Sequence, residues 1–441
     1  MGKYDLFFKL AKEAGIEEAE LYINENRSLS IELFHGNIEG YTDNNGYTIL
    51  ARGMVKGKFG AASCDVWNKE KAAYLVKEIK ANAGVIESDD PMFIFEGSPK
   101  YKKVSTYNAE LEKVSIEEKI RRLHLLEDTL RNYDPRIIEV SNTEYEEGTE
   151  KITLLNSKGL KLTQKNNYYV YVSSAVAREN EQTKSGFDLL FDNDFSKADV
   201  EALARKIGQE TVDQLGGEAC KTATYKAVLA PEVVRPLMSV LIDHVDAEEV
   251  QKQSSLFIGK LDQKVLSSKI TIEDRPLDKS FFARGFDDEG VATYNKSIFK
   301  NGVLKTYLYN LTTAAKDGVS STGNGFRSGS KMSTSSTYLI LKPGKKSEEE
   351  LFEEMGDGVY ITEVSGLHAG LNTQSGNFSL QSSGYLVKGG KRDKGLDIIT
   401  ISGNLLEVFN NVIQVGNNLK VSPSGSATPS LLIKKIAVSG K

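Results

Sequence analysis

Residues 20–63 consist of short runs in which apolar and polar side chains alternate: Glu20-Leu21-Tyr22-Ile23, Leu29-Ser30-Ile31-Glu32-Leu33, Tyr47-Thr48-Ile49-Leu50 and Lys58-Phe59-Gly60-Ala61. Alternation with a period of two is typical of a strand that buries one face. The runs are separated by residues that favour tight turns, namely Gly36-Asn37, Asn44-Asn45-Gly46 and Lys56-Gly57. This pattern predicts an antiparallel meander of short strands.

Two helical patterns flank this meander. Residues 3–14 carry apolar side chains at helical spacing and are followed by Gly15, where a helix would stop. A second helix is expected to open at residues 65–68 and to end near Gly84. Residues 1–86 therefore form one expected unit of helix, antiparallel strands and helix.

The same order returns in residues 115–217. Ser115 and Glu118 have the spacing of a capping box, and the helix that they begin runs to about residue 131. Strand-like runs follow at 137–143, 149–155, 160–163 and 168–177, with turns expected at 156–159 and at Asn166-Asn167. A last helix begins near residue 196 and ends at Gly216. The repeated order raises the possibility of a structural duplication, and residues 87–114 are the expected linker between the two units.

The composition becomes richer in short strands and glycine turns over residues 218–441. A strand is expected at 225–230, and helices are expected around 232–244 and 346–355. The region is long enough to form a closed or nearly closed sheet. The predicted fold class is α+β, with two helix/antiparallel-sheet/helix units followed by a β-rich, barrel-like C-terminal domain.

The composition is that of an ordinary globular protein. The chain has 441 residues, of which 39% are apolar and 27% are charged, and its net charge is −5. No apolar run approaches the roughly 20 residues of a membrane-spanning helix, and no basic block indicates a nucleic-acid surface. Cys64 and Cys220 show no CxxC spacing, which excludes a zinc ribbon and a thioredoxin-type pair. We expect a cytoplasmic protein that binds neither nucleic acid nor membrane.

The four histidines lie far apart in sequence, at His35, His124, His244 and His368. None of them belongs to an HExxH motif, so a helical zinc site of that type is not predicted. His244 is flanked by carboxylates in residues 243–249, a pattern typical of a solvated helix end. His368 lies in a region rich in polar loop residues and is the best candidate for a catalytic base, although no GxSxG motif nominates a nucleophile.

Two further segments are candidates for a binding or catalytic site. Residues 321–327 are rich in glycine but lack the spacing of a phosphate-binding loop, which favours a simple turn. Residues 286–290 place three acids, Asp287, Asp288 and Glu289, within a short stretch that suits a cation or peptide-amine site or a solvated turn. Loops that bind hard cations usually spread their ligands over alternate positions, so the turn is the favoured interpretation.

An ordered set of motifs along nearly the whole chain resembles the TldD/PmbA family. The motifs are Ala19–Tyr22, Ile38-Glu39, Ser255–Leu261, Ile270–Asp274, Phe286–Val291, Asn301–Leu308, Ser321–Arg327, Thr373–Ser379 and Thr428–Leu432. The resemblance implies a cytoplasmic proteolytic system, historically described as modulator of DNA gyrase. In it two related subunits, TldD and PmbA (also called TldE), form a heterodimer that processes or degrades peptides.

The resemblance also bears on the metal. TldD-like subunits carry HExxxH and a downstream cysteine as their zinc site, whereas PmbA-like subunits lack them. Counting without gaps from shared motifs places HExxxH opposite Met238-Ser239 and Asp243, and it places the cysteine opposite Val415. The resemblance therefore implies a PmbA/TldE-like subunit without a cofactor of its own, and it implies zinc in the partner.

The leading hypothesis is a non-metal subunit that completes a substrate chamber with a zinc-bearing HExxxH partner and acts on peptides or unfolded proteins. The alternatives are an autonomous non-zinc hydrolase that uses His368 or a serine, and a non-catalytic peptide-binding homodimer. The residues expected to face the substrate are those of two family motifs: Asp287, Asp288, Glu289, Gly290, Gly323, Asn324 and Arg327.

Overall fold

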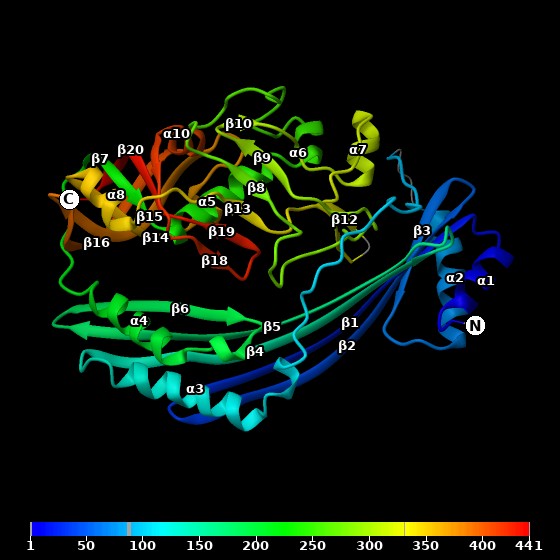
Figure 1. The fold of residues 1–441 in the computed structure, drawn as a ribbon, viewed down its shortest axis with the longest axis horizontal. Helices are drawn as coiled ribbons and strands as arrows, with labels where there is room; N and C mark the ends of the chain where they lie inside the picture. Colours follow the sequence, from blue (N-terminus) through cyan, green and yellow to red (C-terminus); the bar gives the residue numbers. More distant parts are fainter. Residues whose placement is uncertain (1, 86–89, 330, 441) are drawn as a thin grey trace.

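The computed structural model describes residues 2–85, 90–329 and 331–440. A long curved sheet runs through the molecule, and the C-terminal region lies along it (Figure 1). This sheet has the strand order β3-β2-β1-β4-β5-β6, and all its pairings are antiparallel. Its strands are β1 (Glu18–Phe34), β2 (Asn37–Val55), β3 (Lys58–Cys64), β4 (Ile137–Asn156), β5 (Lys161–Glu179) and β6 (Gln182–Asp192).

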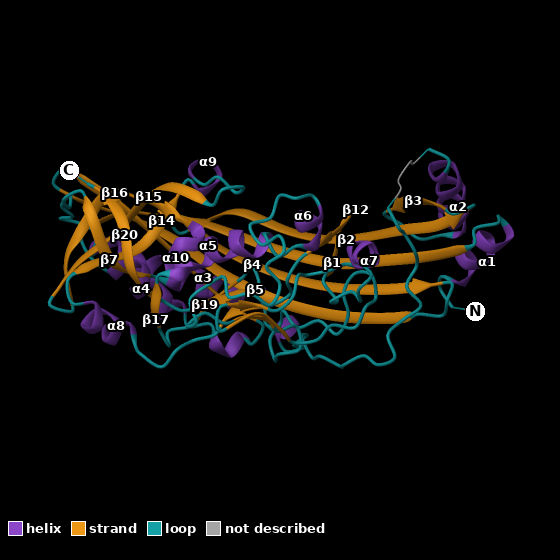
Figure 2. Ribbon diagram, turned by 90° about the horizontal axis from the view of Figure 1, so that it is seen from above, coloured by secondary structure: helices purple, strands orange, loops and turns teal. Residues whose placement is uncertain are grey.

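The two units predicted from the sequence, residues 1–86 and 115–217, share this one sheet. Strand β1 pairs with β4 from Glu20 opposite Asn156 to Leu33 opposite Thr143. Seen from above, the strands run side by side along most of the length of the molecule (Figure 2). Each unit thus contributes three neighbouring strands, and the join between the units is a continuous ladder of hydrogen bonds.

Two of the predicted turns are wrong. Asn44-Asn45-Gly46 lies inside β2, where Asn45 pairs with Arg27 of β1, and Asn166-Asn167 lies inside β5. The short runs expected on either side of these residues are therefore single long strands. Polar residues interrupt the apolar alternation there, but they do not interrupt the backbone ladder. Asn167 is fully buried because its side-chain amide exchanges hydrogen bonds of 2.8 Å with the backbone of Asn108.

The predicted helices of the N-terminal half are confirmed. Helices α1 (Asp5–Glu13) and α2 (Lys69–Ala83) lie at one end of the sheet, and α3 (Ile116–Arg131) and α4 (Val200–Val212) pack on β4, β5 and β6. Ser115 caps α3 by accepting a hydrogen bond from the Glu118 backbone N–H. Helix α4 begins four residues after the expected start because Asp199 is its cap. Two short 3-10 turns, η1 (Leu111–Lys113) and η2 (Phe195–Lys197), precede α3 and α4.

The C-terminal region contains a closed five-stranded barrel, which confirms the predicted barrel-like domain. Strand order β16-β15-β14-β7-β20 closes through the pairing of β16 with β20, and β17 extends the sheet beyond β20. The elements of this barrel are β7 (Ala223–Leu229), β14 (Gly358–Ser365), β15 (Asn377–Lys388), β16 (Lys391–Asn404), β17 (Val412–Val415), β20 (Leu431–Ser439), α8 (Glu348–Met355), α9 (Leu367–Gly370) and α10 (Leu405–Asn410).

A second six-stranded sheet packs beside the barrel in the order β10-β9-β8-β13-β19-β18. Helix α5 (Pro231–Asp243) contacts both β14 of the barrel and β19 of this sheet. The remaining elements are β8 (Ile272–Asp274), β9 (Lys296–Lys300), β10 (Val303–Leu304), β13 (Leu339–Leu341), β18 (Lys420–Ser422), β19 (Ser426–Thr428), the hairpin of β11 (Gly325–Ser328) and β12 (Lys331–Thr334), α6 (Ala247–Gln251) and α7 (Leu311–Asp317).

The predicted linker overlaps residues 86–89, which lie outside the described residues. From residue 90 to η1 the chain is extended, and it is fixed by side chains of the rest of the protein. Asn156 donates a hydrogen bond of 2.6 Å to the Phe95 carbonyl, and the Tyr101 hydroxyl donates one of 2.7 Å to the Gly290 carbonyl. Among the described helices, none is both long and apolar enough to cross a membrane.

Helix α2 packs closely on β3 because Gly60 has no side chain. A Cβ at Gly60 would lie 1.9 Å from the Ile79 carbonyl oxygen and 2.7 Å from the Ala83 nitrogen, both of which are helix backbone. We expect Gly60→Ala to push α2 away and to lower the free energy of unfolding by about 1–3 kcal/mol. Urea denaturation followed by the fluorescence of the single tryptophan, Trp67, measures this effect.

Gly84→Ala is the matched control, because Gly84 has a φ of −75° and a Cβ there would meet its nearest atom at 3.4 Å. Equal denaturation midpoints for the two variants would contradict the close packing of α2 on β3.

Candidate functional site

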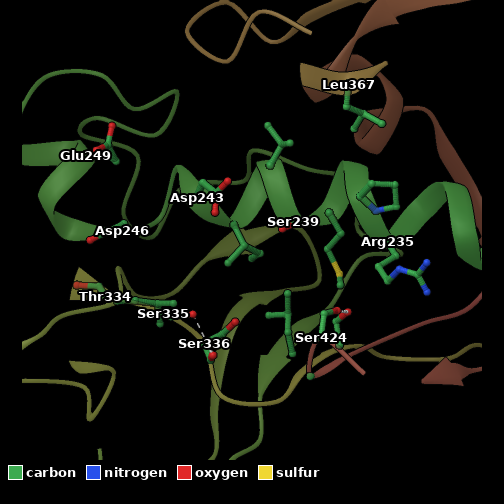
Figure 3. Close-up of a pocket in the computed structure, with 18 residues that line it drawn as sticks. Arg235, Ser239, Asp243, Asp246, Glu249, Thr334, Ser335, Ser336, Leu367 and Ser424 are labelled. Carbon is green, nitrogen blue, oxygen red and sulfur yellow. Dashed lines mark hydrogen bonds between the residues drawn. The ribbon is translucent and has the colours of Figure 1, made fainter. Parts of the chain in front are cut away.

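A cavity of about 720 Å³ opens along one side of α5 (Figure 3). The opposite face of the helix is buried in the core of the C-terminal region through residues such as Val234 and Leu241. The cavity is lined by Arg235, Pro236, Met238, Ser239, Val240, Ile242, Asp243, Asp246, Glu249, Leu308, Thr334, Ser335, Ser336, Leu339, Leu367, Ser424, Gly425 and Ser426. Four separate parts of the chain therefore build most of its wall: α5 and its C-terminal continuation, the end of β12, the turn before β19, and α9.

Charges of opposite sign lie at the two ends of this cavity (Figure 3). Arg235 lies near the N-terminal end of α5, and Asp243, Asp246 and Glu249 lie at and beyond its C-terminal end. Asp246 caps α6 by accepting a hydrogen bond of 2.9 Å from the Glu248 backbone N–H. The cavity thus has one cationic end and one anionic end, with serine hydroxyls between them.

The two aspartates titrate above their ordinary range. Asp243 is exposed at the cavity wall, but the surrounding protein displaces part of its water and raises its pKa to about 6, and the negative charge of Glu249 adds to this effect. Burial likewise raises the pKa of Asp246 to about 6. Both carboxyls are therefore largely ionised at neutral pH, and the end of the cavity that they line attracts cations.

His244 was predicted to lie on a solvated helix end, and this prediction is wrong. The side chain is 5% exposed and meets the Phe257 ring edge to face. Its Nδ1 accepts a hydrogen bond of 3.3 Å from the Leu256 backbone N–H, and its carbonyl accepts one from the Ser255 hydroxyl. Burial lowers the pKa of His244. The chain turns sharply after α5, and this turn carries His244 inward while its acidic neighbours face the cavity.

The positions that the resemblance aligns with zinc ligands carry other kinds of side chain and are not all brought together. Met238, Ser239 and Asp243 line the cavity, whereas Val415 is buried at the end of β17 and is not part of the lining. A thioether, a hydroxyl and one carboxylate do not match the histidine, cysteine and carboxylate ligands that zinc takes. Across the described ranges, no group of three or more His, Cys, Asp or Glu side chains is arranged to hold a metal ion.

His368 lies on α9 with its side chain exposed to solvent. The neighbouring Leu367 lines the cavity, but His368 does not. The structure therefore does not bring His368 together with the cavity serines, and its catalytic role stays a prediction.

The two family loops that were expected to face the substrate lie together, but they are buried. The exposed fractions are 1% for Asp287, 4% for Asp288 and 3% for Glu289, so the interpretation of 286–290 as a solvated turn is wrong. Asp287 accepts backbone hydrogen bonds from Glu289, Val291 and Gly325 at 2.9–3.0 Å. The acidic loop is thus folded around its own backbone and that of the neighbouring loop.

Asp288 connects these loops to the long sheet. Its carboxylate accepts hydrogen bonds from the Tyr22 hydroxyl of β1 at 3.0 Å and from the Arg327 backbone N–H at 2.9 Å, and it pairs with Arg284. Arg327 in turn pairs with Glu20 of β1 at 3.0 Å. Because both partners of that ion pair are almost fully buried, the two regions are joined by charges that water does not reach.

The remaining predicted residues belong to the same buried assembly. Asn324 is fully buried and donates hydrogen bonds of 2.8 Å to Asp274 and to the Ser335 carbonyl. Gly323 lies beside Asn324 in this loop. Gly290 has a φ of +87°, and a Cβ there would meet Leu160 at 2.7 Å, so only glycine fits this position.

The sequence analysis missed most of the cavity. Arg235 and Asp246 lack a motif, and Ser335 and Ser424 come from loops that are remote from α5 in sequence. The sequence feature that could have indicated these loops is their composition, since residues 333–336 and 422–426 are dominated by serine.

A second cavity of about 400 Å³ lies between the sheet and the C-terminal region, and its wall carries the aromatic side chains Tyr168, Phe191, Phe281, Phe282 and Phe326.

Glu289 provides a test of the buried assembly. Burial, together with the charge of Asp287, raises the pKa of Glu289 above its ordinary value of 4.5. Above pH 4.5 the unfolded chain loses this proton while the folded chain keeps it, so the contribution of Glu289 to stability falls as pH rises. In Glu289→Gln this contribution is absent, and the amide oxygen can still accept the hydrogen bond of 2.7 Å from the Leu311 backbone.

We therefore expect the stability of Glu289→Gln relative to wild type to increase by about 1–3 kcal/mol between pH 5 and pH 8. Urea denaturation followed by circular dichroism at several pH values measures the difference. Glu201→Gln, which alters an exposed carboxylate of α4, serves as the control. Parallel pH curves for Glu289→Gln and wild type would show that Glu289 does not keep its proton in the folded protein.

Three protein-family models match successive parts of the chain. A model described as PmbA/TldA metallopeptidase domain 1 matches residues 19–83. The PmbA/TldA metallopeptidase central domain matches residues 109–215, and the C-terminal domain matches residues 222–440. The three matches follow one another in family order and cover most of the chain.

Similar proteins match over the same length. A crystal structure from Thermotoga maritima, provisionally named as a modulator of a DNA gyrase, is 33% identical, covers 99% of both chains and has a TM-score of 0.92. A metalloprotease PmbA homolog from Buchnera aphidicola is 25% identical over 98% of this chain and 95% of its own. TldE from Thermococcus kodakarensis, 22% identical over 100% of both chains, shares the fold with a TM-score of 0.92. This chain belongs to the PmbA/TldD family and has its metallopeptidase-like fold.

Proposed function

We propose that this chain is the non-metal subunit of a cytoplasmic TldD/TldE-type peptidase complex. In this proposal it forms the substrate chamber together with a zinc-bearing HExxxH partner, and it takes no direct part in bond cleavage. The complex processes or degrades peptides or unfolded proteins. The proposal rests on the side chains of one face of α5. Met238, Ser239 and Asp243 stand there at the positions that the resemblance aligns with HExxxH.

The composition of the cavity supports a role in binding rather than in catalysis. The cavity lining offers carboxylates but no imidazole or thiolate, so in this proposal the zinc-based route to hydrolysis needs another subunit. The wall still offers hydroxyl groups from Ser239, Ser335 and Ser424 as hydrogen-bond partners for a peptide backbone.

The hairpin beside the cavity supports the binding of an extended chain. Strands β11 and β12 form a two-stranded sheet, so each has an edge that no other strand of the described chain occupies. Strand β12 ends at Thr334, which lines the cavity. A peptide added along such an edge is held by backbone hydrogen bonds and needs little sequence specificity. This property suits a subunit that presents many different peptides to its partner.

Co-expression with the HExxxH-bearing relative from the same genome tests the proposal. We expect the two chains to co-elute in size-exclusion chromatography, with one zinc per pair, and to cleave an unstructured peptide in a chelator-sensitive reaction. The control is a partner in which the glutamate of HExxxH is replaced by glutamine, which should assemble without cleaving. This chain alone should contain no stoichiometric zinc by elemental analysis.

Three outcomes would count against this function. Failure of the two chains to associate excludes the heterodimer. Chelator-resistant cleavage by the purified chain alone, lost in His368→Ala, supports an autonomous hydrolase instead. A stable homodimer that binds peptides, with no cleavage in either assembly, supports the non-catalytic alternative.

A further inference from the structure

Helix α5 spaces the polar groups of the cavity in a regular way. Arg235, Ser239 and Asp243 occupy positions i, i+4 and i+8, which lie along one face of an α-helix. At a rise of 1.5 Å per residue, the two charged residues are separated by about 12 Å along the helix axis. The helix therefore fixes a cation, a hydroxyl and an anion in a line along the cavity.

The two charges at the ends of this line have no partner within the described residues. No hydrogen bond or ion pair joins the Arg235 guanidinium or the Asp243 carboxylate to another described side chain, and their separation prevents them from pairing with each other. Asp246 and Glu249 add further negative charge beside Asp243, and no cation lines that end. Lys252, at the end of α6, pairs with Glu248 outside the cavity and does not belong to its lining.

The middle of the cavity suits the backbone of a short chain. Serine hydroxyls approach from three directions: Ser239 on α5, Ser335 and Ser336 after β12, and Ser424 before β19. Met238 and Leu339 supply apolar surface between them. Hydroxyl groups can donate to carbonyl oxygens and accept from N–H groups, so they satisfy a peptide backbone without selecting its side chains.

We propose that this cavity binds a short peptide of three or four residues with both termini free, its carboxylate at Arg235 and its ammonium group among Asp243, Asp246 and Glu249. An extended chain advances about 3.3–3.6 Å per residue, so three or four residues span the distance between the charged ends. The choice of a peptide among doubly charged ligands rests on the proposed function. The ligand class is that of small peptides, which a peptidase either consumes or releases.

Calorimetric titration of the purified chain with tetra-alanine tests this inference and does not require the partner subunit. We expect saturable binding of the free peptide, and we expect both the N-acetylated and the C-amidated forms to bind at least tenfold more weakly. Among alanine peptides of two, four and eight residues, four should bind most tightly. Equal binding of free and blocked peptides, or absence of saturable binding, would overturn the proposal.

Two variants assign the termini. Asp243→Asn should weaken the free peptide but leave the affinity of the N-acetylated form unchanged, because that form has no ammonium group. Arg235→Ala should weaken the free peptide but leave the C-amidated form unchanged, whereas Arg235→Lys should keep part of the affinity. The loss caused by each variant and the loss caused by blocking one terminus are then not additive, and this identifies which side chain binds which terminus. If each variant weakens free and blocked peptides alike, the assignment of the termini is wrong.

The controls lie outside the cavity. Glu248→Gln and Arg205→Ala remove charges near α5 and on α4 and should leave binding unchanged. Circular dichroism confirms folding of each variant, and the absence of partners for Arg235 and Asp243 makes their replacement tolerable. Failure of the chain to assemble with an HExxxH relative would overturn the proposed function but not this binding, so the two failures are distinguishable.

Discussion

The carboxylate of Asp288 joins the long N-terminal sheet to the C-terminal region. It accepts hydrogen bonds from Tyr22 of β1 and from the backbone of Arg327, and it pairs with Arg284, while Arg327 continues to Glu20. A buried ion pair costs desolvation energy that its attraction only partly offsets, so such contacts add little net stability, but separating the partners leaves an uncompensated buried charge. This constraint fixes where the C-terminal region lies along the sheet.

The same buried assembly positions the cavity. Asp274 is fully buried, pairs with Lys296, and accepts hydrogen bonds from the Thr337 and Tyr338 backbone and from the Asn324 side chain. Asn324 also binds the Ser335 carbonyl, and Ser335 lines the cavity opposite α5. None of the residues 287–290, 323, 324 and 327 lines this cavity, and their loops reach it through the chain that they hold in place.

Helix α5 keeps its place in the fold although the residues on its cavity face do not suit zinc. Its buried face packs against the barrel and against β19, and Arg235, Ser239 and Asp243 do not belong to this core. The exposed face is thus free to carry Arg235, Ser239 and Asp243 without a cost to folding.

Local sequence determined the helices, their caps and the β-rich C-terminal region, because these depend on spacing along the chain, and the family resemblance pointed to the positions that do not match the zinc ligands. Tertiary structure alone decided three other features. Asn45 and Asn167 lie within strands because a partner strand completes their backbone ladder or a distant residue satisfies their side chain. Asp287 and Asp288 are buried because the backbone N–H groups of Gly325 and Arg327 and the hydroxyl of Tyr22, all remote in sequence, donate hydrogen bonds to their carboxylates. Arg235 meets Ser335 and Ser424 across a cavity because three distant segments converge there, and no local pattern records such a convergence.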